Sequence, residues 1–304
     1  MLTETPLVIF TIIAQMSAGS FVVLGLIHLL YVRTDPATMD RVSDPALYAI
    51  GPVLVLGLVA STFHLGSPMR AANALRHLDS SWLSREILAG LIFALLGGLF
   101  AVCQWRKWLP ARTRQALAVV VAVNGLVLVY CIGRVYTLRT VPAWDTSLTM
   151  VRFFTTTILL GSLAVGAALV IASLVRARKG DEAAASRLLI LNSVRGIAVG
   201  CVVLLGVKFV VQQSYISGLA NNPDPAAKAS MDILSKTDGG FSLAQGILTF
   251  ACLAILGIFL AQLSRGKVGH RAVVSVAMSA FSLILVGEVI GRMLFYASMV
   301  RVGM

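Results

Sequence analysis

A polar stretch of 24 residues, HLGSPMRAANALRHLDSSWLSREI, interrupts a chain that is otherwise mostly apolar. It runs from His64 to Ile87 and holds two of the four histidines, together with three arginines and two acids. Histidine and carboxylic acid side chains can accept and release protons in a bound site. Proton transfer is therefore the chemistry that these residue types could perform, provided that the rest of the chain positions them.

The composition identifies the solvent that surrounds this stretch. Hydrophobic residues make up 58% of the 304 positions and charged residues only 12%, and the mean hydropathy is +0.89. Soluble domains of this length are much less apolar and carry about twice as many charged residues. The composition predicts an integral membrane protein.

Eight apolar runs are long enough to cross the hydrocarbon core as helices. They are residues 7–31, 45–64, 86–104, 115–134, 153–175, 188–218, 242–263 and 272–297. The sixth run is too long for one span, so we expect the part around Gln212–Tyr215 to emerge into water or to bend along the interface. The sequence predicts an all-α bundle of eight transmembrane helices, forming one membrane domain over residues 1–304, with no soluble domain.

The distribution of basic residues predicts the orientation of the bundle. The loops 32–44, 105–114, 176–187 and 264–271 carry 13 lysines and arginines in 43 positions, whereas the segments on the other side carry 8 in 75. Cytoplasmic loops are the ones enriched in lysine and arginine. We therefore expect both termini and the polar stretch on the non-cytoplasmic side. The net charge of +12 then follows from topology, and nucleic-acid binding is not needed to explain it.

The cysteines and histidines do not form a recognisable metal or haem site. Each cysteine stands alone in an apolar run, without ligand spacing, so we expect packing residues and neither an iron–sulfur cluster nor another metal site. No two histidines share a depth within the spans, so we expect no haem. These residues are Cys103, Cys131, Cys201, Cys252, His28, His64, His77 and His270.

Six charged residues fall inside the apolar runs, where a charge costs on the order of 2.5–3.5 kcal/mol. They are Glu86, Arg134, Arg195, Lys208, Glu288 and Arg292. All except Arg195 are expected toward the non-cytoplasmic side, beneath the polar stretch and close to His64. A concentration of costly charges at one depth indicates a functional site.

Each of these residues also has a structural interpretation. Glu288 and Arg292 are four positions apart and could form a buried ion pair on one helix face. Arg134 could neutralise the carboxyl end of its helix, and Glu86 could be a first-turn acid on a capped helix. His64 could simply donate a hydrogen bond to a loop carbonyl.

Several motifs carry a resemblance that covers the whole chain. HLGSPMRAANAL is followed by WLSREI, then by GRVYTLRTVPAWDT at 133–146 and by GEVIGRMLFYA at 287–297. In these motifs, and in its plan of eight helices with outside termini, the chain resembles the membrane-anchor subunit of the dimethyl sulfoxide reductase family.

The resemblance implies a three-subunit respiratory complex in the bacterial inner membrane. A molybdopterin catalytic subunit and a four-cluster iron–sulfur subunit would accompany this multi-pass anchor. The anchor itself would hold no haem, iron–sulfur cluster or molybdenum, and would not act on the terminal substrate. It would exchange electrons with a quinol, either menaquinol or ubiquinol, in the bilayer.

The family's motifs also imply which residues contact the quinol. The histidine of HLGSP and the acid of S-x-E-I match His64 and Glu86, which we expect to accept the two protons that quinol oxidation releases. Arg85, Arg70 and Tyr136 are expected to orient the headgroup. Arg134, Lys208, Glu288 and Arg292 are expected to lie as buried charges near the site.

The partners and the direction of electron flow are further expectations. The iron–sulfur subunit should dock on the loops 65–85, 135–152 and 219–241, with Trp144 as an interface anchor. The same anchor type also serves sulfite-oxidising complexes, in which electrons enter quinone, and that interpretation stays open. A secondary transporter is the remote alternative, but the chain lacks the inverted repeats and broken helices typical of that class.

Overall fold

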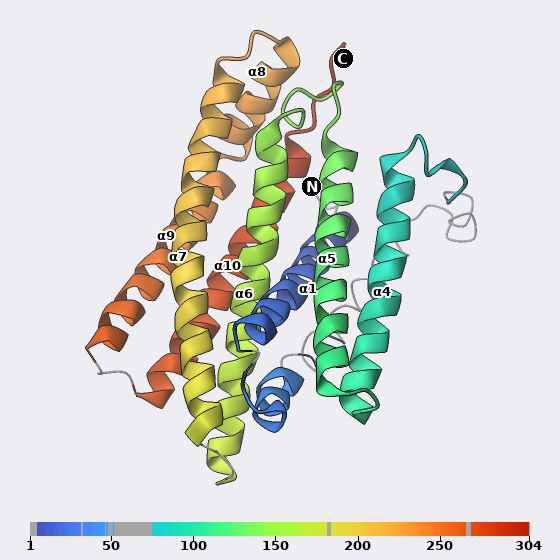
Figure 1. Ribbon diagram of the computed structural model, residues 1–304. Coiled ribbons are helices and arrows are strands. Elements are labelled where there is room, and N and C mark those ends of the chain that lie inside the picture. The colour runs from blue at the N-terminus through green and yellow to red at the C-terminus, as the bar shows by residue number, and fades with distance from the viewer. Residues whose placement is uncertain are drawn as a thin grey trace.

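The computed structural model describes residues 5–31, 33–45, 47, 51, 75–180, 184–265 and 269–303 of the chain. Across these ranges there are helices and turns but no β-strand. Seven helices in this part of the chain are long and apolar enough to cross a membrane. They are α1 (Thr5–Leu30), α4 (Trp82–Arg106), α5 (Ala111–Tyr136), α6 (Ser147–Arg178), α7 (Ala184–Ala220), α9 (Gly239–Ser264) and α10 (His270–Ala297) (Figure 1).

These seven helices confirm seven of the eight predicted runs. The second run, 45–64, lies largely outside the described residues. The helices extend beyond the predicted apolar runs by a few residues, because polar residues continue several of them at their ends. The predicted sixth run becomes α7, a single helix of 37 residues that passes through Gln212 and Gln213 without a break.

Short helices and side-chain caps shape the connections between the spans. Ser81 accepts a hydrogen bond from the Ser84 amide at the start of α4, and Thr146 accepts one from the Leu148 amide at the start of α6. Such caps satisfy amides that have no partner inside the helix. The segment 75–77 forms the short helix η3 (Leu75–His77).

The segment 219–241 is mostly helical, so its prediction as a loop was wrong. It contains α8 (Pro225–Asp232) and the single π-type turn η4 (Ile233–Thr237). Asp224 caps α8 by accepting a hydrogen bond from the Ala226 amide, and Pro225 occupies the first helical position. Proline and aspartate are turn residues, but in this order they also start a helix.

Long-range contacts define the two ends of the bundle. At the first, the Trp144 end, the indole of Trp144 donates a hydrogen bond to the Phe295 carbonyl, and the Val302 amide donates one to Thr140. At the second, the Asp40 end, Arg114 contacts Asp40 and Arg176 contacts the Arg41 carbonyl. The connections between α4 and α5, α6 and α7, and α9 and α10 all lie at the Asp40 end (Figure 1). The basic loops are therefore gathered at one end, as predicted.

Helix α1 occupies the middle of the bundle and contacts α5, α6 and α10 (Figure 1). Its closest approach is to α6, where Gly19 faces Gly161 and Thr157. A Cβ atom on Gly161 would collide with the backbone of Gly19 and Ser20, and one on Gly19 with the Thr157 carbonyl. Glycine allows this backbone-to-backbone contact, which is how helices pack in membranes.

Candidate functional site

Glu86 is a buried carboxylate near the start of α4, at the Trp144 end. It is the fifth residue of the helix, and only 8% of it is exposed. The α4 first turn contains no acid, so Glu86 does not act as a first-turn acid on the helix dipole. No hydrogen bond joins its carboxylate to another residue that the structure describes. A buried carboxylate without a protein partner is free to bind a ligand.

Arg85 and Arg134 both lie against the ring of Trp82, beside Glu86. The guanidinium of Arg85 is 4.3 Å from the ring centroid and that of Arg134 is 5.0 Å away. Arg85 also donates hydrogen bonds of 2.7 Å to the carbonyls of Leu78 and Asp79. It therefore fixes the connection before α4. The Nε atom of Arg134 is buried and has no partner among the described residues.

Tyr136 belongs to a buried aromatic cluster that joins α5, α6 and α10. Its hydroxyl accepts a hydrogen bond of 2.9 Å from the Tyr296 hydroxyl, and Glu86 lies within electrostatic range of both tyrosines. The rings of the cluster are Tyr136, Trp144, Phe153, Phe295 and Tyr296. Trp144 is only 4% exposed and stacks on Phe295. Its prediction as an interface anchor was therefore wrong, because the indole is used inside the bundle.

Lys208, Glu288 and Arg292 form a second polar group, between α6, α7, α10 and α1. Lys208 donates a hydrogen bond to one carboxylate oxygen of Glu288, and Thr156 donates one of 2.9 Å to the other. Arg292 instead donates to the side-chain oxygen of Gln15. The salt bridge of Glu288 thus reaches α7, and the predicted alternative of an ion pair with Arg292 was wrong.

The predicted site residues therefore occupy two groups, with the aromatic cluster between them. Arg85, Glu86 and Arg134 lie at α4 and α5, whereas Lys208, Glu288 and Arg292 lie on the other side of α1. Tyr136 connects to the second group through Tyr296, which follows Arg292 by one turn. His64 and Arg70 lie outside the described residues. Arg195 is exposed on α7.

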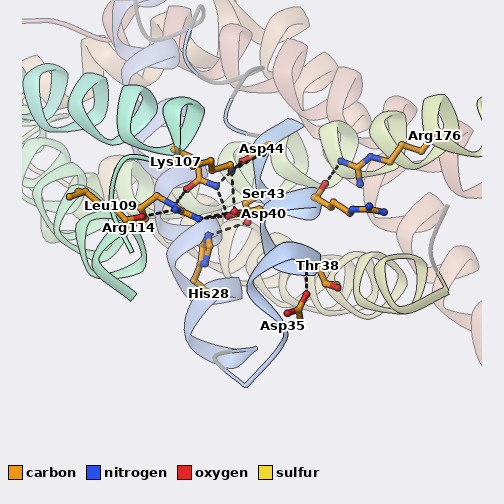
Figure 2. A network of polar contacts seen from close by, with 12 residues as sticks. His28, Asp35, Thr38, Asp40, Ser43, Asp44, Lys107, Leu109, Arg114 and Arg176 are labelled. Carbon is orange, nitrogen blue, oxygen red and sulfur yellow. Dashed lines mark hydrogen bonds and ion pairs between the residues drawn. The ribbon is translucent and has the colours of Figure 1, made fainter. Parts of the chain in front are cut away.

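A further polar cluster at the Asp40 end has no counterpart in the sequence predictions (Figure 2). Asp40 accepts hydrogen bonds from Gln104 and Arg114 and forms a 3.2 Å ion pair with Lys107. Arg114 also donates to the Gln104 side chain and to the Leu109 carbonyl. The cluster joins the helical segment 36–45 to the turn between α4 and α5. Its members are 64 to 74 positions apart in sequence, so no local motif predicts it.

Electrostatics hold Asp40 in its charged form. Burial alone would raise the pKa of this carboxyl, but the hydrogen bonds from Gln104, Lys107 and Arg114 lower it below its usual value. Close by, His28 of α1 exchanges a 3.1 Å hydrogen bond with Ser43. Because every charged member of the cluster has a protein partner, this cluster clamps the segment 36–45 to the bundle.

Comparisons with known proteins place these features in a family. Over 302 residues the sequence is 32% identical to a component chain of the anaerobic dimethyl sulfoxide reductase of Escherichia coli K12, covering 99% of this protein and 96% of the relative. It is 29% identical over 303 residues to the identically named protein of Haemophilus influenzae, covering 100% and 97%. A sulfite dehydrogenase subunit from Allochromatium vinosum is 33% identical over 137 residues, or 40% of this protein and 41% of the relative.

The family model described as DMSO reductase anchor subunit (DmsC) matches residues 1–298. This match includes all seven described spans and extends over the segment between them that carries HLGSP. With relatives aligned over almost their full length, the chain belongs to the DMSO reductase anchor subunit family.

Proposed function

We propose that this chain is the quinol-binding membrane anchor of a three-subunit molybdopterin oxidoreductase in a bacterial inner membrane. It passes electrons from quinol to a four-cluster iron–sulfur subunit. A molybdopterin subunit then reduces dimethyl sulfoxide or a similar S- or N-oxide. Membership of the DMSO reductase anchor subunit family supports the proposal, as do two full-length relatives named as chains of anaerobic dimethyl sulfoxide reductase.

The observation that carries the quinol site is the buried, unpartnered carboxylate of Glu86. Oxidation of a quinol releases two electrons and two protons, so its hydroxyl groups need hydrogen-bond acceptors that can take protons. Glu86 is such an acceptor, and its place near the Trp144 end shortens the path from the bilayer to water. His64 is proposed as the second acceptor, since its imidazole titrates near neutral pH.

The remaining residues orient the site. Arg85 is proposed to hold the connection above the headgroup, because two of its nitrogens already bind the carbonyls of residues 78 and 79. Tyr136 acts through the position of its hydroxyl, which Tyr296 fixes. Arg70 is proposed to contact the headgroup or its exit path. Arg134 keeps a cation beside Trp82, where it stabilises the charged form of a nearby carboxylate.

The iron–sulfur subunit is proposed to dock at the Trp144 end, which faces the non-cytoplasmic side. The segments 65–85, 135–152 and 219–241 gather at that end, and α8 supplies a structured surface there. Docking at this end would bring the nearest cluster above Glu86. The menaquinol or ubiquinol substrate would enter from the bilayer.

The test of the site is Glu86→Gln in the assembled complex, with quinol-dependent reductase activity and binding of a quinol analogue as readouts. Glutamine keeps the shape of the side chain but cannot take a proton. We expect at least a hundredfold loss of activity, within the range that a positioned acid or base contributes. Asp79→Asn, at an exposed acid of the same region, is the matched control and should retain activity. Unchanged activity and analogue binding in Glu86→Gln would remove Glu86 from the site.

The second candidate function is electron entry into quinone from a sulfite-oxidising complex. The partial match to a sulfite dehydrogenase subunit favours it. The same side chains can serve both directions, because they accept protons in one and return them in the other. A reporter fusion at the C-terminus separates the proposed orientations: activity of a periplasmic reporter supports the reductase, and activity of a cytoplasmic one supports a complex that faces the cytoplasm.

A further inference from the structure

A cavity of about 270 Å³ lies between α6, α7, α9 and α10 near the Trp144 end. Met231, Leu234 and Ser235, in α8 and η4, form part of its wall. Arg152, Gln212, Gln245 and Phe295 line it and also line a smaller cavity of about 30 Å³. The smaller cavity reaches Lys208, Glu288 and Arg292, so the two form one polar space. We call this space the α7–α10 cavity.

Two hydrogen-bond donors in its wall have no partner among the described residues. The hydroxyl of Tyr215 is buried without a partner, although only 5% of the residue is exposed. The Nη1 atom of Arg152 is likewise buried and unpartnered, and its guanidinium lies 4.6 Å from the centroid of the Tyr215 ring. Buried donors without acceptors are costly and rare. Both donors line the cavity, so an acceptor placed there satisfies them together.

The charges of the wall show which kind of acceptor fits. Arg152, Lys208 and Arg292 are cations, and Glu288 is the one acid among the described residues that line the cavity. Lys208 pairs with Glu288, which leaves Arg152 and Arg292 without a counter-charge. The hydrogen bond of Arg292 goes to the neutral side chain of Gln15. Two uncompensated cations inside a membrane bundle favour an anionic occupant.

The surroundings indicate that this anion carries acyl chains. Phe209 and Val210 of α7 and Leu243 of α9 are exposed, and they adjoin the lining residues Val211 and Ser242 in sequence. These side chains form an apolar surface beside a cationic pocket. A lipid has the matching shape, with an anionic head for the pocket and hydrocarbon for the surface. A quinone headgroup is neutral and does not offset the two cations.

We infer that the α7–α10 cavity binds the phosphate headgroup of an anionic phospholipid, with Arg152 and Tyr215 as donors to the phosphate oxygens. Gln212 and Gln245 complete the polar wall. This site is separate from the proposed quinol site at α4 and does not depend on it.

The test uses the full chain purified in mild detergent together with the subunits that co-purify. Lipid binding is measured by native mass spectrometry during titration with phosphatidylglycerol. We expect Arg152→Gln to weaken the tightest binding event by about tenfold or more, as the loss of a charge-assisted hydrogen bond predicts. Tyr215→Phe should weaken it several-fold. Because Tyr215→Phe removes only an unpartnered hydroxyl, it should fold normally and keeps the test valid if Arg152→Gln does not assemble.

Arg195→Gln is the matched control, because Arg195 is an exposed cation on α7 outside the cavity. It should bind phosphatidylglycerol as the unchanged protein does, and neutral phosphatidylcholine should compete poorly. Equal binding in Arg152→Gln, Tyr215→Phe and the unchanged protein would overturn the proposal. Displacement of the lipid by millimolar inorganic phosphate would assign the site to a soluble anion, and displacement by a quinone analogue would assign it to quinone. Either result also contradicts the lipid.

Discussion

Lys208 of α7 contacts Glu288 of α10 at 2.5 Å, and the second carboxylate oxygen of Glu288 accepts a hydrogen bond from Thr156 of α6. A single buried carboxylate therefore connects three helices that are 80 and 132 positions apart in sequence. This contact lies well inside the bundle, where competing water is scarce.

Removing either partner of this pair should destabilise the fold. Lys208→Met leaves Glu288 as a buried charge without its cation, and we expect a loss of about 3 kcal/mol in the free energy of unfolding. The double variant Lys208→Met with Glu288→Gln should lose less than the sum of the single variants. Unfolding in detergent, followed by circular dichroism, measures both. Arg195→Met is the control on an exposed face of α7, and single variants no less stable than it would show that the pair contributes nothing.

The contact between α1 and α6 should not tolerate an added methyl group. Gly161→Ala places a Cβ atom against the backbone of Gly19 and Ser20, so the two helices must separate. We expect destabilisation of about 1–3 kcal/mol, the usual cost of overpacking. Gly166→Ala, further along α6, is the control, because its Cβ would meet the Ile197 side chain at an ordinary 3.5 Å. Equal melting temperatures for the two variants in detergent would disprove the close contact.

The Asp40 cluster should make stability depend on acid pH. The pKa of Asp40 is lowered in the folded chain, so its charged form stabilises the fold above the unfolded value near 3.8. That contribution is lost as the pH falls through the folded pKa. Asp40→Asn should therefore lower the melting temperature at pH 7, and its difference from the unchanged protein should shrink below about pH 4. Asp145→Asn, at an exposed acid, should show no such trend. A difference for Asp40→Asn that stays constant from about pH 7 to about pH 3 would contradict this assignment.

Docking at the Trp144 end should protect Lys228 from chemical modification. This lysine is exposed on α8, whereas Lys179 is exposed at the Asp40 end. A lysine-reactive reagent, with mass spectrometry as readout, should label both in the isolated protein. In the assembled complex we expect labelling of Lys228 to fall several-fold while that of Lys179 stays the same. Protection of Lys179 instead of Lys228 would place the partner at the opposite end.

Much of the fold could be predicted from the sequence, because hydrocarbon imposes a length and a composition on every helix that crosses it. Seven apolar runs became helices, and the basic loops gathered at one end. The helix ends were less predictable. Arg152 falls outside the predicted apolar run because it is charged, yet it lies in the second turn of α6, where its guanidinium packs over the Tyr215 ring. Ring packing of this kind leaves no local pattern in the sequence.

The candidate site shows the same limit. The position of Glu86 near the start of a helix could be predicted from the cap residues before it, and so could the cost of burying it. The partner of Glu288 could not be predicted, since a cation four residues away on the same helix and one on another helix fit the sequence equally well. The Asp40 cluster was missed for a related reason. Its members appear as loop charges until packing brings the turn after α4 against residues 36–45.

The position of Trp82 has a consequence for experiments on this protein. Its indole starts α4 one turn before Glu86, and two guanidinium groups lie against the ring. Trp105 and Trp108 are exposed at the other end, and Trp144 is packed inside the aromatic cluster. The protein thus carries a built-in optical reporter, since indole emission responds to nearby charge. With the two exposed tryptophans replaced by phenylalanine, fluorescence can follow occupancy beside the Glu86 carboxylate in real time without an attached dye.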